Sequence, residues 1–501
     1  MQRKQLTLVI VSLLVVVLSV SLAWFTTQII GKGKDVSVTS ANLQIVFTDS
    51  DGALTETDIE PGWSATKTFT IKNDTKTEYK YNIVIKDLLN NFVTEGYLQY
   101  KITSTNDGYN MTEFKDMPKS SAPKDTILAY SVSIPVGVTQ SYTIEFKYAN
   151  DESVDQSEDM GKKLSGTLFI TEGTEDPNKT LLTQLLVDKS TKLTRTDFSK
   201  VLTTDNTNTL YTSTEDSKTV YYFAGNATDN WVKFGKNESN QDLYWRIIRT
   251  NSDGGVRLLY HGTSTTATDA YISSSTAFNS TYNDPMYVGY MYGTSGSQVN
   301  NRTNTNSSTI KGVIDTWYKD NLNSNYGKYL SATAIYCNDR SVTSGTYSVS
   351  SSFGYSAKTR LDVNKTPTYN CADTNDKFTA DTSTGNGKLT YPIALMTADE
   401  VSFAGGKYGS NAPTWYYYNS ANESSTGSTW WWVLSPYIWD GSYAHVFGVH
   451  GSSWPGLLNS NLVLDTGGVR PVTSLKSCVK YSSGDGTATN PYTIQETTSG
   501  C

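Results

Sequence analysis

The stretch Trp430–Leu475, WWWVLSPYIWDGSYAHVFGVHGSSWPGLLNSNLVLDTGGVRPVTSL, decides the fold of the C-terminal half of the chain. It carries five of the 11 tryptophans and two of the three histidines. Its two ends, around Trp432 and Val472, are apolar and predict buried strands. Its middle mixes large aromatic side chains with Gly, Ser and Pro in no regular period, so we expect neither a regular strand nor a helix there.

The aromatic middle of this stretch predicts a recognition surface. Tyr and Trp give large contact areas at low entropic cost, and small flexible residues let such side chains adapt to a partner. The alternative is that the same aromatics form the core of a glycine-rich fold. The predicted ligand-binding residues are Tyr437, Ile438, Trp439, Tyr443, His445, Phe447, His450, Ser452 and Trp454.

The motif WWWVLSP at 430–436, followed by a loose segment and by GGVRPVTSL at 467–475, resembles the end of a C-type-lectin-like domain of bacterial surface proteins. Relatives of that fold include formylglycine-generating-type domains and the variable proteins of diversity-generating retroelements. The resemblance implies an α+β domain over residues 211–478. It also implies a ligand-binding face, diversified between alleles, just before the Gly-Val-Arg-Pro strand.

Composition places the chain among multidomain, β-rich surface proteins. Its 501 residues suffice for two or three domains, and 34 tyrosines and 11 tryptophans accompany a low charged content of 18%. A net charge of −7 argues against a nucleic-acid partner, which needs a basic footprint. We expect the partner to be a protein or a glycan on another cell or a phage.

The N-terminal residues 1–30 predict export. Residues 6–25 carry no charge and are long enough to span a bilayer as a transmembrane helix, and Arg3 and Lys4 precede them. Ser21-Leu22-Ala23 also fits a signal-peptidase site. The chain is therefore expected outside the cell, either anchored in the bacterial cytoplasmic membrane or secreted.

Residues 36–173 predict a β-sandwich, because short apolar or alternating runs are separated by turn signals. LAWFT at 22–26 and IEPGWSATKTFTIKN at 59–73 resemble the camelysin and biofilm-matrix-fibre family of Gram-positive surface proteins. The expected strands are Leu43–Phe47, Thr66–Ile71, Tyr79–Ile85, Leu98–Thr103, Leu128–Ile134, Ser141–Phe146 and Leu164–Thr171.

The remaining segments are assigned from local signals. Residues 174–210 are expected to be a linker with one short amphipathic helix at Leu181–Leu186. In the distal domain, Asn251-Ser-Asp-Gly-Gly255 predicts a hairpin turn. Ser308 and Thr397 are expected to cap two short helices. Residues 479–501 are expected to be a turn-rich tail.

All four cysteines lie in the last third of the chain, in no zinc-binding or Cys-x-x-Cys pattern. In an exported protein they predict disulfides, of which Cys337–Cys371 with Cys478–Cys501 is the most local pairing. Four buried free thiols are the alternative.

Signals for chemistry are weak. His445 and His450 with Asp440 or Asp465 lack the spacing of a metal framework, and Asp253 and Asp485 sit in Asp-Gly turns that are more often only turns than calcium sites. No catalytic residue, metal or cofactor is assigned. The leading hypothesis is an adhesin-like surface protein that displays a recognition face on a β-sandwich stalk. A matrix or pilus-like fibre subunit is the second hypothesis, and a secreted enzyme the third.

Overall fold

The computed structural model describes residues 36–40, 43–49, 54–56, 59–174, 176, 179–267, 270–416, 430–451 and 454–501. The chain divides into two compact units, residues 1–177 and 178–501, and the division falls inside the acidic stretch Glu172–Asn178. The predicted membrane segment 6–25 lies outside the described residues. Among the residues described, no helix is both long and apolar enough to cross a bilayer.

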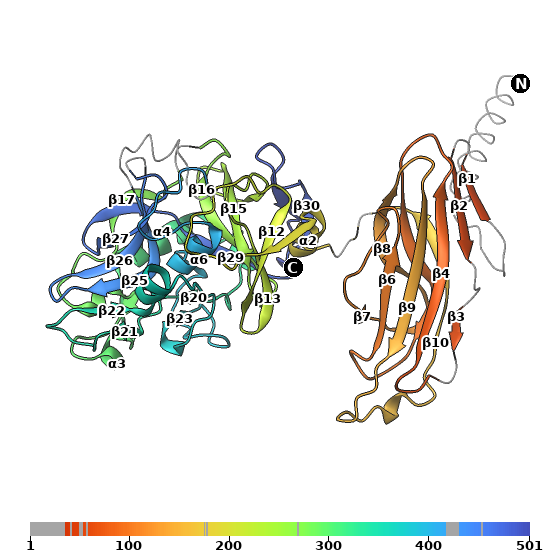
Figure 1. Ribbon diagram of the computed structural model, residues 1–501, viewed down its shortest axis with the longest axis horizontal. Helices are drawn as coiled ribbons and strands as arrows, with labels where there is room; N and C mark the ends of the chain where they lie inside the picture. The colour runs from red at the N-terminus through yellow and green to blue at the C-terminus, as the bar shows by residue number, and fades with distance from the viewer. Residues whose placement is uncertain are drawn as a thin grey trace, which may run out of the picture. The chain divides into compact units, whose positions relative to one another are not determined.

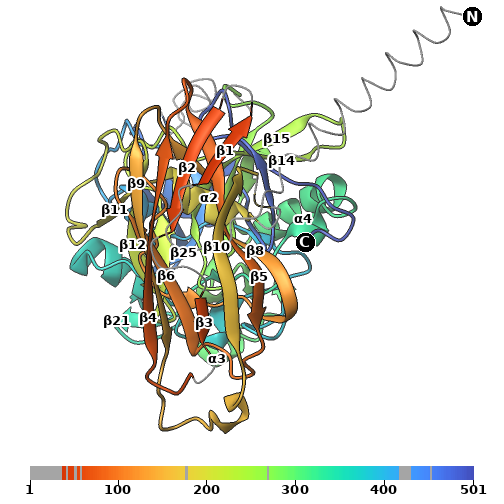
Figure 2. The ribbon, with the colours of Figure 1, turned by 90° about the vertical axis from the view of Figure 1, so that its right-hand side faces the viewer.

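The first unit is a sandwich of two antiparallel sheets (Figure 1). One sheet has six strands, in the order β1 (Val36–Ser40), β2 (Leu43–Asp49), β4 (Ser64–Asn73), β9 (Thr139–Tyr148), β6 (Leu98–Ser104) and β7 (Lys115–Asp116). The other has four, in the order β3 (Leu54–Glu56), β10 (Leu164–Glu172), β5 (Tyr79–Asn90) and β8 (Ser120–Ile134). Figure 2 shows β10, β5 and β8 side by side. A short 3-10 helix, η1 (Ser157–Asp159), precedes β10.

Strict alternation explains why the sequence predicts these strands well. Along β9 every second side chain is buried, because successive residues of a strand point to opposite faces of the sheet. The buried residues include Ile144 of β9 and Phe69 of β4, and they share one core with Ile83 of β5 and Leu168 of β10 from the facing sheet. All seven predicted strands are present, so the expected β-rich sandwich is confirmed for this unit.

The second unit is built around two larger sheets. The main path of the ten-stranded sheet is β11 (Thr191–Thr194), β12 (Thr209–Glu215), β13 (Lys218–Tyr222), β15 (Asp242–Thr250), β14 (Trp231–Lys236), β31 (Tyr492–Ile494) and β30 (Tyr481–Ser483). Beside this path, β16 (Val256–Gly262) pairs with β15 and with β29 (Val472–Leu475), which also pairs with β24 (Ile393–Ala394).

The seven-stranded sheet carries the aromatic stretch. Its main path is β17 (Ser273–Ala277), β28 (Thr466–Val469), β25 (Trp431–Trp439), β22 (Phe353–Tyr355) and β21 (Val342–Ser344). Off this path, β26 (Ala444–Val449) pairs with both β25 and β27 (Leu458–Leu462). Two small pairs complete the strands, β18 (Met291–Tyr292) with β19 (Asn306–Ser307) and β20 (Tyr336–Cys337) with β23 (Lys377–Phe378).

Short helices lie between the strands of the second unit. The α-helices are α2 (Leu181–Asp188), α3 (Gln298–Asn301), α4 (Thr309–Asn321), α5 (Ser356–Lys358) and α6 (Ala398–Ala404). A π-helical turn, η4 (Thr359–Asn364), follows α5, and single 3-10 turns are η2 (Pro285–Val288), η3 (Gly327–Tyr329) and η5 (Thr374–Asp376).

Local signals in the sequence correctly predict two helix caps and one hairpin turn of the second unit. Ser308 accepts a hydrogen bond from Lys311 N and begins α4, and Thr397 forms a capping box with Glu400 at the start of α6. The turn between β15 and β16 holds Gly254 at a φ of +81°, a conformation that glycine adopts without steric cost.

The second unit is longer at both ends than the domain expected at 211–478. Helix α2 and β11 lie in the stretch expected to be a linker, and Leu181 and Leu185 of α2 belong to the core of the unit. The stretch expected to be a tail supplies β30 and β31, and Tyr492 is fully buried. Propensity in the separate segments could not reveal these long-range contacts.

The middle of the aromatic stretch forms regular strands, so the prediction of irregular structure there was wrong. Within that middle, β25 continues to Trp439, and five of the six residues of β26 are buried, because β26 lies between β25 and β27 and is covered on both faces. A strand covered on both faces shows no alternation of apolar and polar residues. Register shifts between β25 and β26 further blur the pattern.

Both predicted disulfides are present. Cys337 bonds to Cys371 and Cys478 bonds to Cys501, and no described cysteine is free. The second bridge joins the residues before β30 to the chain end after β31. It therefore ties together the two flanks of the β30–β31 hairpin.

Candidate functional site

The predicted recognition residues lie on and around the meander β25–β26–β27. Trp439 at the end of β25 pairs with Ala444 at the start of β26, and Val449 at the end of β26 pairs with Leu458 at the start of β27. The β25–β26 turn is held by Asp440, whose Oδ1 accepts hydrogen bonds from the backbone N–H groups of Ser442 and Tyr443 at 2.8 and 2.7 Å. The meander therefore has two ends about 20 Å apart, the length of a six-residue strand.

Three of the predicted residues are buried. Trp439 is 1% exposed, Phe447 is 0% exposed and His450 is 8% exposed. Trp439 and Phe447 belong to the main core of the second unit, so they hold the sheet together and offer no surface to a partner. For these side chains the alternative reading as core residues is correct, because β25 and β26 are interior strands.

The β25–β26 turn exposes a first group of aromatic and charged side chains. Tyr443 is 39% exposed and stacks on Tyr282, which is 37% exposed, with ring centroids 5.1 Å apart and planes 14° apart. Next to them, His445 Nε2 lies 2.9 Å from Asp440 Oδ2. Burial raises the pKa of Asp440, but His445 and the turn N–H groups outweigh it and hold that pKa below its usual value. We call Tyr282, Asp440, Tyr443 and His445 the turn group.

Between the two ends of the meander, Tyr437 and Ile438 are half-buried. The Tyr437 ring stacks on Tyr408 with centroids 5.2 Å apart, and the two hydroxyl oxygens lie 2.7 Å apart. Lys358 Nζ lies 5.5 Å from the centre of the Tyr437 ring, within the range of a cation–π contact. Burial, followed by the hydrogen bond with Tyr408, raises the pKa of Tyr437, so this phenol stays protonated.

The loop after β26 exposes Trp454, the outermost of three packed aromatic rings. Trp454 is 55% exposed, and its ring lies edge-on to the His450 ring at 5.6 Å. On the other side, His450 stacks on Trp430 at 6.1 Å. His450 Nε2 is buried and has no hydrogen-bond partner within the described part of the chain. Burial lowers the pKa of His450, so the ring is neutral at pH 7. We call Trp430, His450 and Trp454 the loop group; Ser452 lies outside the described residues.

Two glycines make room for the loop group. A Cβ at Gly448 would lie 2.9 Å from the Trp430 ring, and a Cβ at Gly467 would lie 2.7 Å from it. Any other residue at these positions would displace the indole. The second of these glycines opens the Gly-Gly-Val-Arg-Pro motif, so one role of the motif is to seat Trp430.

The weak metal and calcium signals do not converge on one site. His445 and His450 are five residues apart in an extended chain, a span of about 16 Å, which is too far for one ion. Asp465 accepts a hydrogen bond from Leu462 N and closes a turn. Within the described ranges, no group of three His, Cys, Asp or Glu side chains is arranged to hold a metal.

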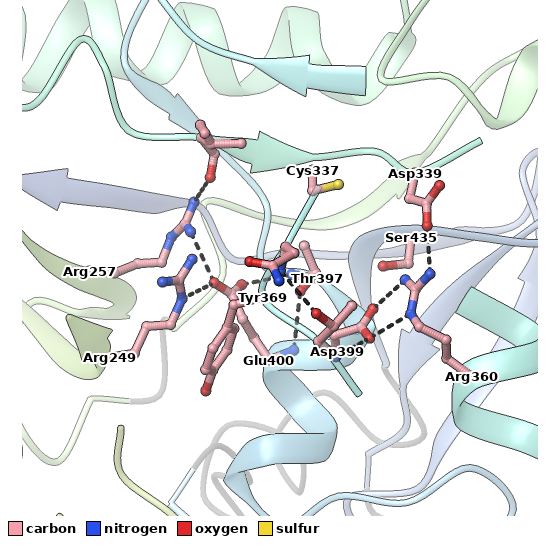
Figure 3. Close-up of a pocket in the computed structure, with 13 residues that line it drawn as sticks. Arg249, Arg257, Cys337, Asp339, Arg360, Tyr369, Thr397, Asp399, Glu400 and Ser435 are labelled. Carbon is pink, nitrogen blue, oxygen red and sulfur yellow. Dashed lines mark hydrogen bonds and ion pairs between the residues drawn. The ribbon is translucent and has the colours of Figure 1, made fainter. Parts of the chain in front are cut away.

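A separate cluster of charges lines a small cavity beside α6 (Figure 3). Arg249 bonds to Glu215 and Glu400 at 2.8 and 2.9 Å, and Arg257 bonds to Glu400 at 3.0 Å. Figure 3 shows a second set in which Arg360 bonds to Asp339 and Asp399, at 2.6 and 2.9 Å. The space between the two sets is about 20 Å³, enough for a single water.

This cluster is a structural one. Burial raises the pKa of Glu215 and of Asp339, but their arginine partners outweigh it and hold both pKa values below the usual range. Glu215 and Asp339 therefore stay ionised, and each is paired with an arginine. The arrangement fixes α6 against β15 and β16, and it leaves neither space for a substrate nor an unpaired acid or base.

Sequence reasoning missed three residues that pack on the predicted ones. Tyr282 and Tyr408 come from segments remote from the aromatic stretch, and Lys358 comes from α5. Each is a single aromatic or charged residue in a loop or helix end, without a motif that would separate it from other such residues. Long-range pairing alone brings them to β25 and β26.

Comparisons with known proteins show no family for this chain. No family model matches it, and no curated protein matches it. A ruminal GH26 endo-β-1,4-mannanase is 14% identical over 30% of this chain and 29% of its own, with a TM-score of 0.15. A Paenibacillus xanthan lyase is 12% identical over 51% of this chain and 19% of its own, with a TM-score of 0.14. The chain thus spans less than a third of either enzyme, and scores this low show no common fold.

Proposed function

We propose that this chain is a bacterial surface protein whose second unit binds an extracellular ligand through the turn group and the loop group. One observation carries the proposal. Among the described residues only three Phe, Tyr or Trp side chains are exposed, Tyr282, Tyr443 and Trp454, at 37%, 39% and 55%. All three belong to the β25–β26–β27 meander or stack on it.

Exposed aromatic side chains are costly to leave in water and are typical of binding surfaces. In the turn group a stacked tyrosine pair lies beside the Asp440–His445 pair, so apolar faces and hydrogen-bonding groups are close together. That combination suits a glycan, whose rings pack on aromatic faces while their hydroxyls need polar partners. It also suits a peptide segment.

Location outside the cytoplasm is part of the proposal. It is supported by two disulfides, which form and persist in oxidising compartments, and by the charge-free run at 6–25 in the sequence. The assignment of the second unit to the C-type-lectin-like domains rests on the resemblance of the WWWVLSP and GGVRPVTSL motifs.

Arrays of glycans and of extracellular proteins test the binding proposal. The full chain is compared with Tyr443→Ala and Trp454→Ala, and with Val187→Ala as a matched control, because Val187 is 70% exposed but lies in α2. We expect array signals that one or both aromatic variants lose and that the control keeps. Signals kept by both aromatic variants would refute the assignment of the surface.

Diversification is tested by sequencing alleles of the locus. If the resemblance to retroelement variable proteins holds, substitutions concentrate at Tyr437, Ile438, Tyr443, His445 and Trp454, while Trp432, Trp439 and Arg470 stay fixed in the core. Substitutions spread evenly over the surface would contradict diversification and would leave the binding proposal unaffected.

A further inference from the structure

A buried lysine and a buried aspartate meet where the second unit begins. Lys189 is the residue at which α2 ends, and Asp229 lies just before β14. Lys189 Nζ is 2.8 Å from Asp229 Oδ2, and the two side chains are 1% and 2% exposed. Among the residues that the structure describes, no other lysine–carboxylate pair has both side chains less than one-tenth exposed.

The two oxygens of Asp229 have different environments. Oδ2 accepts hydrogen bonds from Lys189 Nζ and from Asn208 N, the latter at 2.7 Å. Oδ1 is buried and has no hydrogen-bond partner among the residues that the structure describes. An ionised carboxylate with one unsatisfied oxygen is costly inside a protein, since the lost hydration is not replaced.

The lysine is enclosed by groups that hold it in place. Nζ also donates to the carbonyl of Asp485 at 3.1 Å, and it lies 5.4 Å from the centre of the Tyr492 ring. Tyr492 in turn donates to Asp188 Oδ2 at 2.9 Å. The amine and the carboxyl group are therefore fixed in contact in a site from which bulk water is excluded.

We propose that Lys189 and Asp229 condense to an intramolecular isopeptide bond. A proton first passes from Nζ to the carboxylate along the existing hydrogen bond, which gives a neutral amine and a neutral acid. The Nζ lone pair then attacks Cγ, so that a C–N bond forms and the Cγ–Oδ1 bond breaks. Oδ1 takes the proton first passed to Oδ2 and a second proton from Nζ and leaves as water. Oδ2 remains as the amide oxygen, and Nζ keeps one hydrogen. The reaction needs no oxidant, reductant or cofactor.

Three features of the site favour this reaction. The oxygen that leaves is the unsatisfied one, and the oxygen that stays keeps the Asn208 N–H as a donor for the charge that develops on it. Condensation replaces two buried charges, each costly to desolvate, by one neutral amide. Fixed contact of the reacting groups supplies effective molarities of roughly 10⁵–10⁸ M.

The position of the bond indicates its purpose. The chain enters the second unit just before α2, which lies beside β30 (Figure 1). There Leu181 N donates a hydrogen bond to Val479 O, and Thr180 forms an isolated β-bridge with Lys480. A bond from Lys189 to Asp229 would attach α2 covalently to the residues leading into β14. Any force arriving through the chain from the first unit would then meet a covalent link rather than a helix end. This inference does not depend on the ligand-binding proposal.

Mass spectrometry of the full chain tests the bond. Wild type, Asp229→Ala and the control Lys192→Arg are reduced, denatured and weighed. Beyond the mass change of each substitution, we expect wild type and Lys192→Arg to be lighter than Asp229→Ala by one water. Asp229→Asn should instead lose ammonia.

Tryptic mapping of the wild type decides the question even if Asp229→Ala fails to fold. We expect one branched peptide containing Lys189 and Asp229, uncut after Lys189 because an acylated lysine is not a trypsin site. Recovery of the two segments as separate, unmodified peptides would overturn the proposal and leave a buried ion pair.

Discussion

Replacing Glu400 by Gln should destabilise the second unit strongly, because one carboxylate serves two buried arginines. Glu400 is 2% exposed, and its Oε1 accepts from Arg249 at 2.9 Å and from Arg257 at 3.0 Å. Arg249 keeps Glu215 as a second partner, but no other ion pair reaches Arg257 within the described part of the chain. Breaking a buried pair from one side costs about 3–5 kcal/mol, since it leaves an uncompensated charge.

Glu400 also caps α6, so the effect of its charge on stability has to be separated from the effect of its capping hydrogen bond. Its Oε2 accepts from Thr397 N at 2.9 Å, a bond that the Gln oxygen can still accept. Thr397→Ala, which removes the cap and leaves the charge, should therefore cost only about 1 kcal/mol. Glu215→Gln is the matched charge control, and it should cost less than Glu400→Gln because Arg249 retains Glu400.

Urea unfolding of the full chain, followed by near-ultraviolet circular dichroism, measures these differences. For Glu400→Gln we expect a lower midpoint at unchanged slope, which indicates lost stability without a change in unfolded-state compactness. A loss below about 1 kcal/mol, or equal losses for Glu400→Gln and Glu215→Gln, would show that the cluster does not carry the energy assigned to it.

Three further predictions concern stability and domain organisation. The Cys478–Cys501 bridge closes a loop with a sequence separation of 23, so replacing both cysteines by Ser should lower the free energy of unfolding by about 3 kcal/mol. Calorimetry measures this loss, and an unchanged melting temperature would contradict it. The lowered pKa values of Glu215 and Asp339 in the folded chain contribute stability that is fully present above their pKa values in the unfolded chain, about 4. This stability is lost as the pH falls through their lower pKa values in the folded chain. Unfolding midpoints that stay constant from neutral pH into that range would refute this. Limited proteolysis should cut the chain within Gly173–Asn178 and spare α2, because α2 is packed into the second unit; early cuts inside α2 would contradict that packing.

The sandwich strands could be predicted from the sequence because each has one face in the core and one in water. Alternation along β9 and turn signals such as Pro61-Gly62 carry that information locally. The caps Ser308 and Thr397 are equally local, since a cap involves residues only three positions apart. The disulfide pairing followed from the closeness of each cysteine pair along the chain.

The candidate site was predictable only in outline. The sequence marks Tyr437–Leu458 as rich in aromatics, but exposure separates Tyr443 from Phe447, and exposure depends on which strands flank β26. Neither the burial of His450 nor the stacking of Tyr282 on Tyr443 has a local signature. The same limit hid strand β31 and the packing of the predicted helix α2 into the second unit, since their partners lie hundreds of residues away.

Hydroxyl-radical footprinting of the full chain, with and without a ligand selected on the arrays, tests the central claim most directly. Tyr282, Tyr443 and Trp454 are exposed in the free protein and should be oxidised readily, whereas buried Trp439 should react slowly in both states. We predict that the ligand protects one or more of the three exposed aromatics and changes Trp439 little. Protection confined to residues remote from the meander, with all three aromatics still oxidised at their free rates, would contradict the account.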